Sequence, residues 1–213
     1  MQFATKPELA LAMITRALDA GVPAGWVAGD EVYGQNAALR RALEERDMPY
    51  VLAVPVNQHV IATIDGRPAD ARVDALSAAV PESDWTRLSA GAGAKGPRLY
   101  DWVRIPIRPL AEPGRYWLLV RRRLTDGELA HYLCFCPPEA SLADLVGVAG
   151  RRWAIEESFQ TGKGEVGLDQ YQVRRYDAWY RHITLACFAH AFLTITRAAT
   201  SGEKGGTSIS MAS

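Results

Sequence analysis

Apolar residues in the first part of the chain recur at spacings that predict alternating helices and strands. Residues 6–20 carry apolar side chains at helical spacing, and Gly21 is placed to end that helix as a C-terminal cap. A short apolar run at residues 26–28 predicts a buried strand. A second helix over residues 36–46 and a second buried strand over residues 50–54 follow. The order helix, strand, helix, strand favours an α/β fold with parallel strands.

The pattern changes over residues 57–138, where turn residues are frequent and helical spacing is rare. Strands are predicted over residues 99–107, 116–124 and 130–135, and a short helix over residues 74–79. We therefore interpret this stretch as a β-rich insertion in the α/β fold.

Helical spacing returns after the insertion. Ser141 is a favourable N-cap for a helix that runs from about residue 142 into the 160s, with Ala149–Gly150 as the point where it could break. A last helix is predicted over residues 176–198. The tail over residues 199–213 is polar and rich in glycine, so we expect it to be disordered.

Composition places the chain among ordinary globular proteins. Of its 213 residues, 48% are hydrophobic and 23% are charged, which is enough apolar material for a core. Lys and Arg together number 24, as do Asp and Glu, so the net charge of zero does not by itself indicate a nucleic-acid-binding protein. Residues 95–123, however, hold eight basic and two acidic residues. Such a local basic stretch can form a phosphate-facing surface.

Cysteine usage and the termini indicate where the protein resides. Cys134, Cys136 and Cys187 lack the spacing of a zinc site, and we expect small buried side chains in a reducing cytosol. The first residues do not have the pattern of a signal peptide, and the sequence has no run of eighteen uninterrupted apolar residues. We therefore expect a cytoplasmic protein without a membrane partner.

Asp30 is the first candidate site residue, because it follows the first predicted strand directly. In open α/β sheets, ligands gather outside the carboxyl ends of the strands. A carboxylate at that point is well placed to hold a divalent metal ion. The alternative is that Asp30 caps a turn or the helix that follows, and position alone does not decide between the two.

Three charged residues of the predicted helix after Ser141 form the second candidate group. Arg152 and Glu156 are four residues apart, and Glu156 and Lys163 are seven apart, so all three share one helix face. Spacing alone is equally typical of a surface helix with intrahelical ion pairs. His182 and His190 are eight apart on the last helix, which favours packing over a metal site.

The second group resembles the signature of a known family. The spacing Arg152–x3–Glu156–x6–Lys163 is similar to the Tyr–Arg–Glu–Lys signature of bacterial insertion-sequence transposases of the DDE type. The tyrosine of that signature falls on Ala149, so its contact is absent or is supplied differently. The stretches 28–34 (Ala-Gly-Asp-Glu-Val-Tyr-Gly) and 179–185 (Trp-Tyr-Arg-His-Ile-Thr-Leu) also resemble this family, and the resemblance extends to about residue 198.

The resemblance implies an RNase H-like fold and a metal site. The family holds two Mg²⁺ ions, which Mn²⁺ can replace, between two Asp and one Glu. Asp30 would be the second Asp and Glu156 the Glu. Arg152 and Lys163 would contact DNA phosphate near the cleaved bond, and the insertion would help to hold transposon ends. Three arginines, at positions 121–123, stand at the end of a predicted strand, and alternation places Arg121 and Arg123 on one face. In this family, that face is a candidate for further phosphate contacts. The alternative is a strand end that is only exposed to solvent.

The resemblance also divides the chain. Residues 1–56 would form part of the RNase H-like core and residues 57–138 the insertion, while residues 139–198 would supply the C-terminal helices that carry the Glu. No further strand that could carry the first Asp precedes the strand before Asp30. We therefore expect a C-terminal fragment with an incomplete core and an open sheet edge.

Three functions follow as hypotheses. The first is a transposase fragment that acts on DNA in the full-length family, could dimerise in a DNA complex, and does not cut DNA alone. The second is an inhibitor that holds transposon ends without catalysis. The third is an unrelated metal-dependent nuclease with an RNase H-like core.

Overall fold

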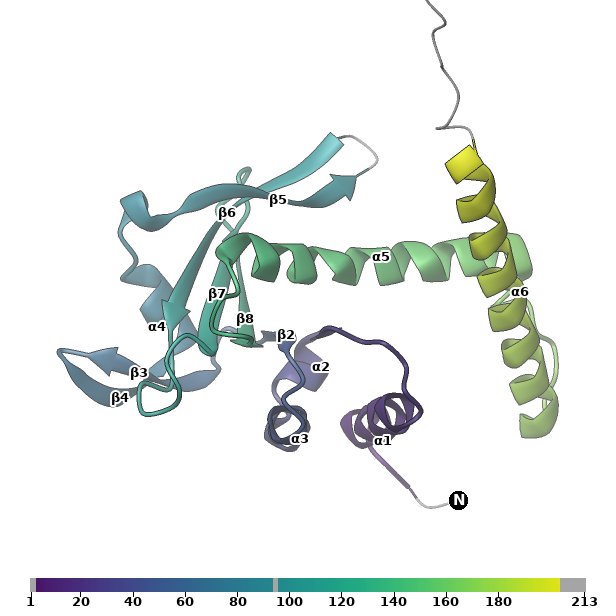
Figure 1. The fold of residues 1–213 in the computed structure, drawn as a ribbon, viewed down its shortest axis with the longest axis horizontal. Coiled ribbons are helices and arrows are strands. Elements are labelled where there is room, and N and C mark those ends of the chain that lie inside the picture. The colour runs from purple at the N-terminus through teal and green to yellow at the C-terminus, as the bar shows by residue number, and fades with distance from the viewer. Residues whose placement is uncertain (1–2, 94–95, 204–213) are drawn as a thin grey trace, which may run out of the picture. The chain divides into compact units, whose positions relative to one another are not determined.

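A computed structural model describes residues 3–93 and 96–203 of the chain (Figure 1). The chain forms two compact units, Met1–Arg152 and Trp153–Ser213, which we call unit 1 and unit 2. The sequence predicts a disordered tail from residue 199, which is wrong for residues 199–203 because they belong to the last helix; residues 204–213 lie outside the described residues.

Unit 1 is built on one six-stranded mixed sheet. Its strand order is β1 (Val27–Gly29), β2 (Tyr50–Val54), β8 (Leu129–Phe135), β7 (Tyr116–Arg122), β6 (Gly96–Pro106) and β5 (Thr86–Gly93). Strands β1 and β2 are parallel, and all other neighbours are antiparallel. The β-rich stretch therefore continues the sheet that β1 and β2 begin, and β1 lies at one edge of the sheet. This mixed α/β architecture is consistent with an RNase H-like fold.

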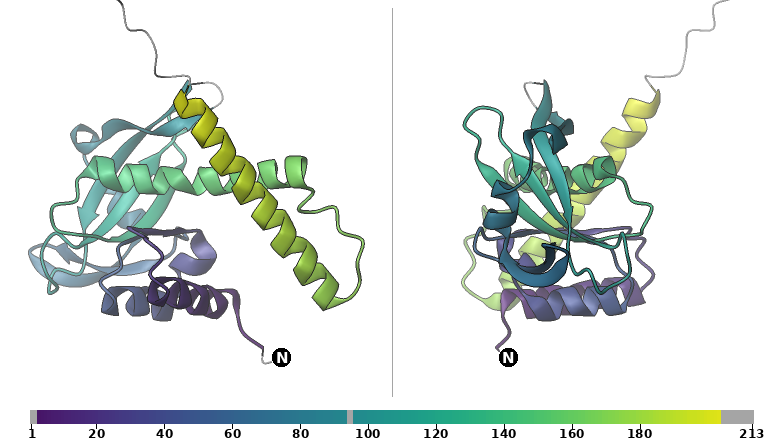
Figure 2. Two further views of the ribbon diagram at one scale, coloured as in Figure 1. Left: turned by 45° about the vertical axis from the view of Figure 1, so that its right-hand side comes forward. Right: turned by 90° about the vertical axis from the view of Figure 1, so that its left-hand side faces the viewer.

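Helices and a hairpin complete unit 1, and most begin where the sequence offers a cap. The helices are α1 (Lys6–Asp19), α2 (Glu31–Gly34), α3 (Ala37–Glu45) and α4 (Val73–Ala78); a 3₁₀ turn, η1 (Glu82–Asp84), and a hairpin of β3 (His59–Ile64) and β4 (Arg67–Arg72) accompany them. Thr5 and Glu8 form a capping box at α1, and the Asn36 side chain accepts a hydrogen bond of 2.8 Å from Leu39 N at α3. Figure 2 shows α1 and α3 side by side.

The strands of the sheet bury side chains on both faces. On β7, Leu118 and Val120 belong to the main apolar cluster together with Leu43 of α3 and Leu52 of β2, and all four are fully buried. Leu119 points to the other face and is fully buried as well. Because alternate residues of a strand face opposite sides, burial on both faces explains why these strands are almost continuously apolar.

Unit 2 contains the C-terminal part of α5 (Leu142–Val166), the helix that crosses the boundary between the units, and all of α6 (Tyr176–Glu203). Within unit 2, Ser158 Oγ lies 3.0 Å from His190 Nε2, Arg197 pairs with Glu165 at 2.8 Å, and His182 lies 3.0 Å from the Gly167 carbonyl. The two histidines thus have separate partners rather than a common one.

Helix α6 differs from the sequence expectation in one respect. An 18-residue stretch within its residues Tyr176–Thr200 has a mean hydropathy of 1.3, so by length and composition alone this helix could cross a membrane. Polar residues interrupt it, which is why a search for uninterrupted apolar residues missed it. The absence of a membrane partner stays a prediction.

The cysteines follow the expectation only in part. Cys134 and Cys136 are buried at the end of β8, and burial raises the pKa of both thiols. Cys187 of α6 is exposed, which corrects the expectation that all three are buried.

Candidate active site

Asp30 lies directly after β1 and begins α2. Its Oδ1 accepts a hydrogen bond of 3.0 Å from Val32 N, and its carbonyl accepts one of 2.9 Å from Gly34 N. The capping role that the sequence left open is therefore confirmed. The side chain is nonetheless exposed, and one carboxylate oxygen is enough for the cap. Capping and ligand binding are thus compatible at this residue.

A pocket of about 570 Å³ lies beyond the carboxyl ends of the parallel strands β1 and β2. We call it the Asp30 pocket. It is lined by the start of α2, the residues at and after the end of β2, part of β8 and two arginines: Asp30, Glu31, Val32, Ala53, Val54, Pro55, Val56, Arg121, Glu128, Leu129, Ala130, His131, Tyr132 and Arg152. Three residues singled out from the sequence, Asp30, Arg121 and Arg152, therefore meet in one pocket of unit 1.

Arg121 reaches the pocket from β7, where it pairs in register with Ala130 of β8. Its guanidinium lies 4.7 Å from the centroid of the Tyr100 ring, and only 9% of the residue is exposed. Burial raises the pKa of Tyr132, while the positive charges of Arg121 and Arg152 act in the opposite direction. Both guanidinium groups therefore lie close enough to Tyr132, a lining residue of the pocket, to act on its pKa.

Arg152 is placed by the packing of α5. The helix starts with a reciprocal pair of bonds, in which Ser141 N donates to Asp144 Oδ2 at 2.9 Å and Asp144 N donates to Ser141 Oγ at 3.2 Å. At Gly150 the helix backbone meets β5 so closely that a Cβ atom would lie 1.9 Å from the Ala90 carbonyl oxygen. The predicted break at Ala149–Gly150 is wrong, because α5 is continuous and the glycine permits close packing. That contact sets the position of Arg152, two residues later.

The other arginines of the triplet have different surroundings. Arg122 points to the opposite side of β7 and binds Glu82 through two bonds of 2.6 and 2.7 Å. Arg123 follows the end of β7, pairs with Asp126 at 2.8 Å and also with Glu128, and does not line the Asp30 pocket. Its phosphate contact stays a prediction, and its two carboxylate partners weigh against it.

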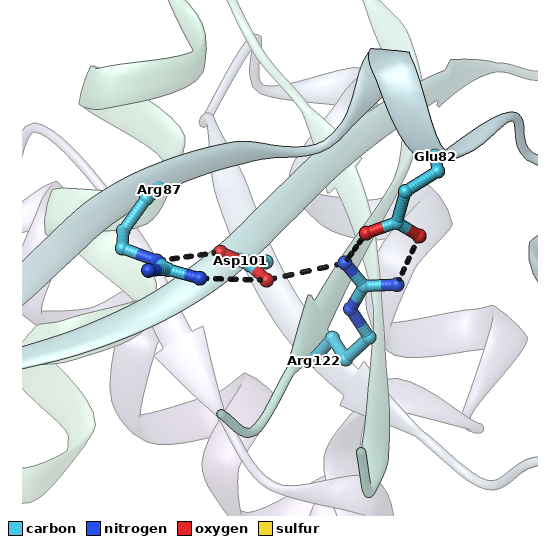
Figure 3. A network of polar contacts seen from close by, with 4 residues as sticks. All are labelled: Glu82, Arg87, Asp101 and Arg122. Atoms are coloured by element: carbon cyan, nitrogen blue, oxygen red, sulfur yellow. Dashed lines mark hydrogen bonds and ion pairs between the residues drawn. The ribbon is translucent and has the colours of Figure 1, made fainter. Parts of the chain in front are cut away.

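Arg122 belongs to a chain of ion pairs that crosses three strands (Figure 3). Asp101 of β6 accepts a bond of 2.9 Å from Arg87 of β5 and one of 3.1 Å from Arg122 of β7. Bonds from Arg87 hold the pKa of Asp101 below its usual value against the effect of burial, and Arg122 adds to this. Sequence reasoning missed this cluster, because no local pattern links residues so far apart. The cluster links β5, β6 and β7, and β7 is the strand from which Arg121 reaches the pocket.

Glu156 and Lys163 lie on the part of α5 that belongs to unit 2, and both are exposed. Because Asp30 belongs to unit 1 and Glu156 to unit 2, the geometry of neither unit tests whether they share a metal ion. Their pairing stays a prediction. Among the residues that the structure describes, no three His, Cys, Asp or Glu side chains are grouped to hold a metal ion. The donor chemistry still suits Mg²⁺, which commonly takes one or two carboxylates and completes its shell with water and substrate phosphate.

Residues 1–95 match the family described as DDE superfamily endonuclease. The matched region contains Asp30, β1 and β2, and ends before β6. No curated protein in the comparison matches the chain.

Proposed function

We propose, from the match of residues 1–95 to the DDE superfamily endonucleases, that this chain carries part of the site for metal-dependent DNA cleavage and strand transfer in transposition. Asp30 and Glu156 would bind the metal, while Arg121, Arg152 and Lys163 would bind DNA phosphate. The observation that carries the proposal is the meeting of Asp30, Arg121 and Arg152 in one pocket outside the carboxyl ends of β1 and β2.

The residue types suit the chemistry of a phosphodiester. A bound Mg²⁺ or Mn²⁺ supplies activation of the attacking oxygen and stabilisation of the leaving oxygen. Arg152 offers a planar fork of donors that matches two phosphate oxygens, and Arg121 adds a second positive charge from a nearly buried position. With Asp30 at the same pocket, these groups would hold the reacting phosphate beside the metal and neutralise its charge.

We further propose that this chain alone does not cut or join DNA. The family that the sequence resembles holds its metal ions between three carboxylates, and the residues that resemble its motifs would provide two, Asp30 and Glu156. The described residues contain no three-ligand metal group that could substitute. A chain that binds phosphate through its arginines but lacks the full metal site would act as an inhibitor that occupies transposon ends, which is the second candidate function.

The test of the phosphate contact compares two neighbouring arginines of α5. Arg152 lines the Asp30 pocket, whereas Arg151 is exposed and does not line it. Binding to a labelled duplex is measured by fluorescence anisotropy at several salt concentrations. We expect Arg152→Ala to weaken binding and to lower the salt slope by about 0.9, as the loss of one phosphate contact does, and Arg151→Ala to leave the slope nearly unchanged. Equal slopes for both variants and the wild type would remove Arg152 from the site.

The inactivity of the chain is tested separately. We expect no nicking of supercoiled plasmid by the wild-type chain with Mg²⁺ or Mn²⁺. Nicking that disappears in Asp30→Asn would show that the chain has a complete metal site and would overturn the claim of inactivity.

A further inference from the structure

A second cleft of unit 1, with a volume of about 400 Å³, shares no lining residue with the Asp30 pocket. It lies between α3, the β3–β4 hairpin and the opposite ends of β2 and β8. Its apolar floor includes Val60, Ile107 and Leu133, and its polar rim consists of Arg40, Arg41, Glu44, His59, Asp70 and Arg108. We call it the Arg41 cleft.

The carboxylates of the Arg41 cleft already have partners. Glu44 accepts a bond of 2.7 Å from the Tyr50 hydroxyl at one oxygen and a bond of 2.8 Å from Arg108 Nη1 at the other. Asp70 lies 2.9 Å from His59 Nδ1. These acids are therefore occupied within the protein and are poor candidates for cation ligands.

Two arginines of α3 complete the rim with positive charge. Ala37, Arg40, Arg41 and Glu44 follow the spacing of one helix face, while Leu39 and Leu43 are buried on another. Arg40 donates one bond to the Gly34 carbonyl, which leaves most of its donors for a ligand. Arg41 is exposed and has no ion pair or hydrogen bond with the residues that the structure describes.

Charge and shape favour a phosphate as the ligand. Three guanidinium groups face two carboxylates in the Arg41 cleft, so an excess of positive charge remains even before any charge on His59. The aromatic rings of the cleft are poor stacking surfaces for a base: Tyr50 is buried, and the Arg108 guanidinium covers the Tyr116 ring at 4.1 Å from its centroid. Without a good stacking surface, the cleft suits the backbone of a nucleic acid better than a nucleotide base.

We propose that the Arg41 cleft binds a backbone phosphate of duplex DNA through Arg41 and Arg40, as a contact separate from the Asp30 pocket. This inference rests on the proposed function in taking DNA as the partner. Arg41 would provide the main contact because its whole guanidinium is available, and Arg40 would assist from a position fixed by Gly34.

The experiment compares the full-length wild type with Arg41→Ala and with the control Arg16→Ala. Arg16 is an exposed helix residue of the same unit, outside both pockets. Neither substitution removes a buried side chain, and thermal melting checks that both variants fold. Binding to a labelled duplex is measured at 50 and 200 mM salt, with a mononucleotide as competitor in a second series.

We expect Arg41→Ala to weaken duplex binding and Arg16→Ala to change it little. Loss of one phosphate contact lowers the salt slope by about 0.9, so the ratio of the Arg41→Ala Kd to the wild-type Kd should shrink by about 3.5-fold between 50 and 200 mM salt.

The other outcomes are distinct. If the wild type binds DNA and Arg41→Ala behaves like Arg16→Ala, the Arg41 cleft is not a DNA contact and the proposed function stands. If the wild type binds no DNA, the proposed partner and this inference both fail. If a mononucleotide binds in an Arg41-dependent way and DNA does not, the cleft accepts a free phosphate ester instead.

Discussion

The contact between Gly150 and β5 can be tested with two glycine-to-alanine substitutions in the same helix. Gly147 and Gly150 are one turn apart in α5. Among the residues that the structure describes, none would lie within 4 Å of a Cβ atom at Gly147, whereas a Cβ atom at Gly150 would lie 1.9 Å from the Ala90 carbonyl oxygen. Helix propensity acts alike on both positions, so a difference between the two variants reports the packing contact alone.

The expected magnitudes follow from these distances. Alanine in place of glycine in a helix interior stabilises by about 0.8–1.0 kcal/mol, which is the full prediction for Gly147→Ala. At Gly150 the helix must move away from a backbone carbonyl in a strand, and overpacking of this kind costs about 1–3 kcal/mol or more. Because the obstacle is backbone, we take the upper end. Gly150→Ala should then be destabilised by about 2 kcal/mol net and differ from Gly147→Ala by about 3 kcal/mol.

The assay is thermal unfolding followed by circular dichroism, together with duplex binding. A difference of about 3 kcal/mol corresponds to roughly 6–12 °C in Tm for a chain of this size. Because Gly150 also places Arg152, the Gly150→Ala protein should bind duplex DNA more weakly than Gly147→Ala at a temperature where both are folded. If both variants had the same Tm, and that Tm were higher than the wild-type value, the close approach of α5 and β5 would be refuted.

The remaining predictions concern two buried polar residues. His131 is 3% exposed and lies 2.9 Å from Ser77 Oγ, and burial lowers its pKa from 6.5. The stability that depends on its neutral form is therefore present above about pH 6.5 and is lost as the pH falls below that value, by up to about 1.4 kcal/mol per pH unit. Urea unfolding at pH 7.5 and 5.5 should show a smaller loss for His131→Gln than for the wild type, and equal losses would contradict this. Asp101→Asn removes the carboxylate between Arg87 and Arg122 and should cost about 2 kcal/mol, whereas Asp84→Asn, at an exposed residue that has no ion pair with any described residue, should cost little. Equal costs in urea unfolding would show that the ion pairs do not stabilise the sheet.

Strong periodicity made much of unit 1 predictable. Helices α1 and α3 and strands β1 and β2 were predicted in the right order, because their apolar residues follow regular helical or strand spacing. Helix α2 was missed because four residues are too few to show a period. The β3–β4 hairpin was missed although its turn, Asp65–Gly66 with φ of 50° and 75°, is a strong hairpin signal.

Contacts between distant segments could not be predicted in this way. A glycine in a helical stretch weakens the local helix preference, so Ala149–Gly150 was predicted as a point where the helix could break, whereas Gly150 permits the close approach of the Ala90 carbonyl. The position of Asp30 after a strand pointed to a site, but the sequence alone could not show that Arg121 and Arg152 enter the same pocket. The Arg87–Asp101–Arg122 cluster and the Arg41 cleft depend equally on the tertiary fold.

We propose that Asp30 and Glu156 would bind the same metal ion, and cleavage of the protein by bound iron tests this most directly. Fe²⁺ can take the place of Mg²⁺ in sites with oxygen ligands, and with ascorbate and peroxide it generates hydroxyl radicals that cut the protein backbone nearby. With duplex DNA present to complete the metal shell, we expect backbone cuts near residue 30 and near residue 156, and the loss of both in Asp30→Asn. Cuts near only one of these positions, or cuts near residue 156 that persist in Asp30→Asn, would contradict it.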